Sequence, residues 1–193
     1  WEPVAAVVDA LDAAFYHAFS AVEPAGARTL LALDVSGSMG TMMPIGISCA
    51  EAAAAMGMVT MRTEPEAYMT GFAQTVIPLP VTRNSTLADV LTKTRNINFG
   101  TTNCTAAIEY AMARKLNVDV FVIITDNETY AGPTHAIVGL NKYRQLTGIP
   151  AKLVVMGMTA TPFTIADPND AGMLDVVGMD AGVPAVVGDF ARD

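Results

Sequence analysis

Three apolar runs constrain the fold of this chain more than any other feature. They span residues 29–33 (TLLAL), 118–125 (VDVFVIIT) and 151–158 (AKLVVMGM), and each has the length of one strand. Strands that are apolar along their whole length belong in a parallel sheet whose two faces are both covered. A shorter run at 67–72 is a fourth candidate strand. The core is therefore expected to form around such a sheet.

The segments between these runs have apolar residues at helical spacing, three or four positions apart. Asp167 followed by Pro168 predicts the start of one further helix, which Gly178 would end. Strands that alternate with helices predict an α/β fold of Rossmann-like type, an open, mostly parallel sheet with helices on both faces. The helices between the strands are expected over 45–61, 87–94, 105–116 and 134–146.

The first 26 residues are set apart from the rest of the chain. Apolar residues recur at helical spacing from Pro3 to about Val22, and the helix breakers Pro24 and Gly26 follow. We expect residues 1–26 to be an N-terminal helix and linker that packs on the domain, and residues 27–193 to be the domain itself. The chain begins at Trp1 without a signal-like segment, so we expect a piece cut from a longer protein.

Composition excludes several classes of function. Hydrophobic residues make up 52% of the 193 residues, which excludes intrinsic disorder. The net charge of −8 argues against nucleic-acid binding by this chain alone. The apolar run 52–61 is too short to cross a membrane. Two cysteines, Cys49 and Cys104, are too few for a disulfide framework and fit a reducing compartment, hence the cytoplasm. A single disulfide between them stays an open alternative.

Polar side chains follow the predicted strands at their carboxyl ends, where open α/β sheets bind ligands. Asp34, Ser36 and Ser38 come directly after the first strand, and Asp126 ends a later one. Thr102 precedes a predicted helix between them. Such oxygens suit a hard cation, foremost Mg²⁺, with Mn²⁺ or Ca²⁺ as alternatives. The five residues are therefore candidate metal ligands.

A structural interpretation of the same residues stays open. Serine and aspartate after a strand are ordinary turn and cap residues. Glu128 is either an acceptor behind the metal ligands or a solvated loop charge, and we favour the loop charge.

The pattern Asp34-x-Ser36-x-Ser38, with Gly-Thr-Thr102 and Thr125-Asp126, resembles the metal-ion-dependent adhesion site of von Willebrand factor A (vWA) domains. From about Leu11 to Phe190 the chain also resembles the A-type domain of the Ro ribonucleoprotein (TROVE) family. The stretches that carry this second likeness are AAAAMGMVTMRTE, FGTTNCT, DVFVIITDNETYAG, IPAKLVVMGMT and FTIADPNDAGMLDVVG.

The resemblance implies a six-stranded vWA sheet and a metal held by the five candidate residues. It implies that the open position on the metal takes an acidic group from a partner. It also implies that the full-length protein carries a ring of helical repeats, closed by this domain, which binds noncoding Y RNA and the single-stranded ends of misfolded RNA. The predicted function is thus a metal-dependent binding and scaffold domain in RNA quality control, and not an enzyme.

Two other functions remain as alternatives. Phosphohydrolases of the haloacid-dehalogenase type also place an aspartate after the first strand, but their pattern is Asp-x-Asp, and Ser36 cannot replace the second acid as a proton donor. A protein–protein adhesion module unrelated to RNA would use the same metal site. As an extracellular domain it would require a secretory signal and disulfides in the parent chain. Neither appears in this sequence, but a piece of a longer protein need not include the signal, so the alternative stays open.

Overall fold

A computed structural model gives the fold, and it describes residues 2–95, 97, 101–126, 134–160 and 164–193. Six strands form one sheet in the order β3-β2-β1-β4-β5-β6, in which only β3 is antiparallel to its neighbour. The expected six-stranded, mostly parallel α/β sheet is confirmed. The strands are β1 (Arg28–Asp34), β2 (Glu66–Phe72), β3 (Val76–Pro78), β4 (Val120–Thr125), β5 (Lys152–Gly157) and β6 (Met173–Val177).

The strand order reverses direction beside β1. The chain passes from β1 to β2 on one side and then returns to place β4 on the other side of β1. Such a switch point leaves a crevice at the carboxyl ends of the two strands. The register pairs Leu33 of β1 with Ile124 of β4, so both strands end at the same level.

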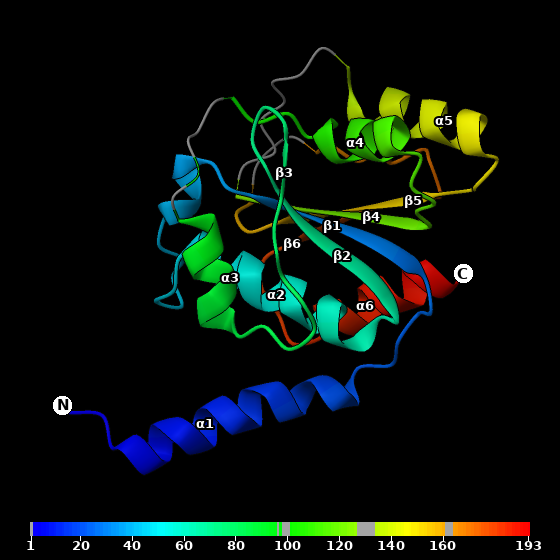
Figure 1. The fold of residues 1–193 in the computed structure, drawn as a ribbon. Coiled ribbons are helices and arrows are strands. Elements are labelled where there is room, and N and C mark those ends of the chain that lie inside the picture. Colours follow the sequence, from blue (N-terminus) through cyan, green and yellow to red (C-terminus); the bar gives the residue numbers. More distant parts are fainter. Residues whose placement is uncertain (1, 96, 98–100, 127–133, 161–163) are drawn as a thin grey trace.

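Helices cover both faces of the sheet, as Figure 1 shows. Alternate residues of β1 explain this, because Leu31 and Leu33 face one apolar cluster and Leu30 and Ala32 face the other. One face carries α2 (Cys49–Thr63), α3 (Leu87–Thr94) and α6 (Val183–Arg192), and the other carries α4 (Ala106–Arg114) and α5 (Ala136–Thr147).

The first helix, α1 (Ala5–Ala18), lies below the layer of α2, α3 and α6 in Figure 1 and is separated by it from the sheet. Its side chains up to Leu11 are exposed, and Leu11 itself is 66% exposed. Contact with the domain is made at its end, where the Tyr16 hydroxyl accepts the Leu87 backbone N–H at 2.9 Å and the Arg62 guanidinium covers the Tyr16 ring. Phe19, in the short 3₁₀ turn η1 (Phe19–Ala21) that follows, is buried. The division of the chain at residue 26 stays a prediction.

One predicted helix is wrong. The segment between Asp167 and Gly178 contains a turn and then strand β6. The Asp167 side chain accepts the backbone N–H of Asn169 at 2.9 Å, so it caps a turn and not a helix. The following residues pair with β5 over nearly its whole length, and this non-local pairing decides their conformation. No helix in the described part of the chain is long and apolar enough to span a bilayer.

Candidate metal centre

Asp34 links the ends of two neighbouring strands. It is the last residue of β1, and only 4% of it is exposed. Its Oδ1 accepts the backbone N–H of Ser36 at 2.8 Å, and its Oδ2 accepts the hydroxyl of Thr125, the last residue of β4, at 2.7 Å. The carboxylate therefore holds both the loop after β1 and the end of β4.

The loop after β1 brings two hydroxyls to the same place. A single 3₁₀ turn, η2 (Gly37–Gly40), folds this loop back, and the Oγ atoms of Ser36 and Ser38 lie 3.0 Å apart. Ser38 Oγ also donates to Asp126 Oδ1 at 3.1 Å, which joins residues 88 positions apart. Asp34, Ser36, Ser38 and Asp126 thus form one cluster of oxygens at the switch point.

The two carboxylates of this cluster are buried, and within the described residues no cationic side chain pairs with them. Asp126 is 6% exposed, and no Lys, Arg or His of the described chain forms an ion pair with it or with Asp34. Burial raises the pKa of Asp34, the nearby Asp126 adds to that rise, and the hydrogen bonds from Thr125 and Ser36 oppose it. Buried charges need compensation. A cluster of only oxygen donors that lacks its own cation fits a hard divalent ion.

Within the described residues, Thr102 forms no hydrogen bond with these four side chains. It is half-buried in a loop whose next residue, Asn103, donates its backbone N–H to Ala73 at 2.8 Å, just beyond the end of β2. The loop therefore lies at the same edge of the sheet, and the role of Thr102 as a ligand stays a prediction. The predicted loop residue Glu128 lies outside the described residues.

Cys104, close behind Thr102, does not add a reactive group. Burial, with a smaller contribution from Asp34, raises the pKa of its thiol to about 12. A thiol with so high a pKa stays protonated near neutral pH and is a poor nucleophile and metal ligand. Cys104 is therefore part of the core, in the apolar cluster under α4 and α5.

Sequence reasoning placed Thr125 in the site motif but gave its side chain no role. Its side chain is fully buried, yet its hydroxyl is satisfied by Asp34. A threonine at the end of an otherwise apolar strand, directly before an aspartate, was the available signal. Thr125 positions Asp34 and does not need to contact an ion.

Comparison with known proteins places this chain in a family. Residues 28–191 match the family model for the Ro60 vWA domain. Over the whole length of this chain, the sequence is 49% identical to the RNA-binding protein RO60 of Deinococcus radiodurans. Over 98% of this chain, it is 42% identical to the RNA-binding protein RO60 of Caenorhabditis elegans. These matches cover 37% and 30% of the two relatives, so the chain spans about a third of their length.

Solved structures agree with the family match. The crystal structure of the Deinococcus radiodurans Ro protein superposes on this chain with a TM-score of 0.91 at 48% sequence identity. The match covers all of this chain and 39% of the Deinococcus chain. The manganese-loaded TRAP protein of Plasmodium vivax superposes with a TM-score of 0.53 at 18% sequence identity. That match covers 87% of this chain and 74% of the TRAP chain, and it shows a shared fold alone.

Proposed function

The chain belongs to the Ro60 vWA domain family, and on that basis we propose that it is a metal-dependent binding module of a larger RNA-binding protein. One observation carries the metal part of the proposal. Asp34, Ser36, Ser38 and Asp126 converge at the switch point of the sheet, and two of them are buried carboxylates that no cationic side chain of the described chain neutralises.

These four residues, together with Thr102, would hold Mg²⁺, or Mn²⁺ or Ca²⁺ in its place. Such an ion supplies a coordination position for an anionic oxygen of a partner, such as a carboxylate. The serine hydroxyls are neutral ligands, so a site with few charged ligands leaves the ion much of its positive charge. The hydrogen bond from Thr125 keeps Asp34 in place beneath the serines.

The RNA part of the proposal rests on the relatives. Both are RNA-binding proteins, and this chain accounts for about a third of each. We propose that RNA, including noncoding Y-type RNA and misfolded RNA, binds through the rest of the full-length protein, a ring of helical repeats that this domain closes. Its place would be the cytoplasm, with which the free, buried thiols Cys49 and Cys104 agree.

No hydrolysis is required of this site. A metal-dependent hydrolase needs a base on the attacking water. Asp34 already accepts two hydrogen bonds from the protein, and Asp126 accepts one from Ser38. We therefore assign the site to binding. Mg²⁺-dependent turnover of a phosphate ester by this chain would contradict that assignment.

Thermal unfolding with and without a divalent ion tests the metal centre. An ion that binds only the native state at about ten times its Kd stabilises it by about 1.4 kcal/mol. For a chain of this size we expect Mg²⁺ or Mn²⁺ to raise the Tm by roughly 3–5 °C, and EDTA to reverse the rise.

Asp34→Asn should abolish this response, because it removes one charge and keeps the shape of the side chain. Asp12→Asn, at an exposed position of α1, makes the same change far from the site and should leave the response intact. A response that survives Asp34→Asn would show that the metal centre is misassigned.

A further inference from the structure

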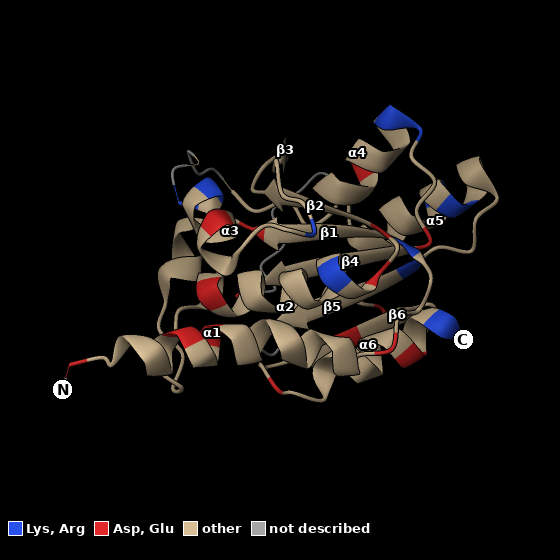
Figure 2. Ribbon diagram, turned by 60° about the horizontal axis from the view of Figure 1, so that its bottom comes forward, with Lys and Arg blue, Asp and Glu red and all other residues tan. Residues whose placement is uncertain are grey.

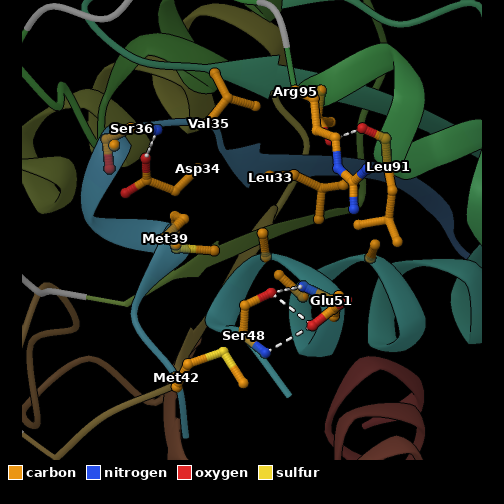
Figure 3. Close-up of a pocket in the computed structure, with 16 residues that line it drawn as sticks. Leu33, Asp34, Val35, Ser36, Met39, Met42, Ser48, Glu51, Leu91 and Arg95 are labelled. Carbon is orange, nitrogen blue, oxygen red and sulfur yellow. Dashed lines mark hydrogen bonds between the residues drawn. The ribbon is translucent and has the colours of Figure 1, made fainter.

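A cavity of about 430 Å³ opens beside the oxygen cluster, and Figure 3 shows it between the loop after β1, the start of α2 and the end of α3. Its volume is in the range of sites that bind small ligands, so it has room for a side chain of a bound segment. Asp34 and Ser36 line it as well as belonging to the candidate metal centre, so the two features are continuous.

The walls and floor of the cavity are mostly apolar. Met39 and Met42 form one side, and Leu91 lies across from them in Figure 3. Three alanines of α2, Ala50, Ala53 and Ala54, line it at the helix. Met42 is 61% exposed, and a flexible methionine at the edge of an apolar cavity can adapt to different side chains.

Besides Asp34, two charged side chains line the cavity, and they differ in their hydrogen bonds to the described residues. Glu51 accepts hydrogen bonds from the backbone N–H and the hydroxyl of Ser48 at 2.7 and 2.8 Å, so it caps α2. Arg95 is exposed and extends into the cavity from the end of α3. The hydrogen bonds from Ser48 and, to a smaller extent, the charge of Arg95 lower the pKa of Glu51, but the Arg95 guanidinium makes no hydrogen bond or ion pair with any described residue. A guanidinium in this position is suited to a carboxylate.

We propose that this cavity is a recognition site for an acidic protein segment. One carboxylate of the segment binds at the metal centre, a neighbouring apolar side chain enters the cavity, and a second carboxylate pairs with Arg95. The inference rests on the proposed function, because the first carboxylate requires the metal.

The lining favours a protein segment over RNA. Sites for single-stranded RNA stack the bases on aromatic rings, and no aromatic side chain lines this cavity within the described residues. The net charge of −8 also opposes a polyanion more than it opposes a short segment with two carboxylates. The apolar walls instead match an aliphatic side chain.

Fluorescence polarisation with a labelled Gly-Gly-Asp-Leu-Glu-Gly-Gly peptide at saturating Mg²⁺ tests this proposal. We expect the peptide in which glycine replaces leucine to bind about tenfold more weakly, since a buried leucine is lost. EDTA should abolish the binding of both. A labelled oligouridylate serves as the RNA probe.

Two variants test the cavity itself. Arg95→Gln should weaken the binding of the leucine peptide about five- to tenfold, since the substitution removes a charge-assisted hydrogen bond. Lys142→Gln makes the same charge change at an exposed position of α5 and should leave binding unchanged. Ala50→Leu should narrow the cavity at α2 and reduce the preference for leucine over glycine. A thermal melt with Mg²⁺ checks that each variant is folded.

Equal affinity of the two peptides would overturn the proposal, as would unchanged binding by Arg95→Gln or no peptide binding at all. Mg²⁺-dependent, Arg95-dependent binding of the oligouridylate in place of the peptides would also overturn it and assign the cavity to RNA. Failure of the proposed function would look different. In that case Mg²⁺ would not raise the Tm of the native sequence, whereas failure of the cavity alone would leave the Tm response and its loss in Asp34→Asn intact.

Discussion

At the level of single residues, Glu64 and Asp34 are buried carboxylates in opposite situations. Glu64 follows the last turn of α2, is 6% exposed, and accepts the backbone N–H groups of Ala25, Gly26 and Ala27 at 2.7, 2.9 and 3.2 Å. Its hydrogen bonds hold the linker that precedes β1. The Asp34 carboxylate accepts two hydrogen bonds, one fewer than Glu64, and it lies beside a second carboxylate, Asp126. For this reason Asp34 is suited to bind a cation and Glu64 is not.

Replacing Glu64 should destabilise the fold without affecting the metal response. Glu64→Ala leaves three backbone donors of the linker without their acceptor, and we expect a loss of about 2–4 kcal/mol in the free energy of unfolding. Urea unfolding monitored by circular dichroism measures it. Glu66→Ala, two residues later at an exposed position of β2, should change stability by less than about 0.5 kcal/mol. Equal effects of the two variants would contradict this role for Glu64.

The Arg144–Asp170 ion pair gives stability a dependence on acid pH. Two hydrogen bonds from the Arg144 guanidinium, the shorter 2.6 Å, lower the pKa of Asp170 in the folded state, and the Gly172 N–H adds to this. The side chains are 22% and 18% exposed, so solvent screens the pair only in part. A lowered folded pKa means that the contribution is present above the unfolded pKa of about 3.9 and is lost as pH falls through the folded value.

Asp170→Asn should therefore reduce stability near neutral pH by roughly 1–2 kcal/mol. The difference from the native sequence should shrink well below about pH 3.9, the unfolded pKa, where the native carboxylate is also protonated. Urea unfolding at several pH values measures both effects. Asp9→Asn, exposed on α1, is the matched control. A difference that stays constant down to the acid limit would show that the ion pair is not its source.

At the level of elements, two helical glycines differ in how closely their helices pack against neighbouring segments. Gly139 of α5 faces α4 so closely that an added Cβ would lie 2.5 Å from Thr105 Cγ2. Gly188 of α6 has room, since its nearest neighbours would be 3.5 Å away. Both positions are in a helix, where alanine is otherwise favoured by about 1 kcal/mol.

The same substitution should therefore have opposite effects. Gly139→Ala should lower the free energy of unfolding by about 1–3 kcal/mol, because overpacking outweighs helix propensity. Gly188→Ala should be neutral or raise it by up to about 1 kcal/mol. Thermal unfolding of the two variants side by side measures this. Stabilisation by both would mean that α4 and α5 are not in the close contact described.

At the level of the whole molecule, charge opposes RNA binding by this chain alone. Nineteen acidic residues face eleven basic ones, and Figure 2 shows Lys and Arg spread over several elements instead of gathered in one stripe. RNA affinity depends on neutralising phosphates. The surface therefore offers no continuous track for a backbone in the described part of the chain.

We expect negligible affinity of this chain for a single-stranded RNA at moderate salt, measured by gel shift. Mg²⁺ should not restore binding, since one ion cannot offset the net charge of −8. Micromolar binding by the 193-residue chain would contradict this prediction and make the metal centre a direct contact for RNA.

The layers of the fold and three of the four clustered site residues follow from local sequence patterns. Apolar runs of strand length that are rich in β-branched residues, such as 120–125, favour strands covered on both faces, so the parallel sheet followed from them. Asp34, Ser36 and Ser38 lie within five residues, and their proximity needed no tertiary information. The family resemblance is likewise carried by local motifs of the amino-acid sequence, and the Ro60 vWA match confirms it.

Contacts between distant segments decided the rest. Asp126 meets Ser38 because β4 pairs with β1 in a register that ends both strands together. Residues 173–177 became β6 because β5 offered them a strand edge, which no local cap signal could reveal. Arg95 reaches the cavity only because α3 packs beside α2. Local patterns fix local conformation, whereas the choice of neighbours depends on packing energies summed over the whole chain, and these exist only in the folded state.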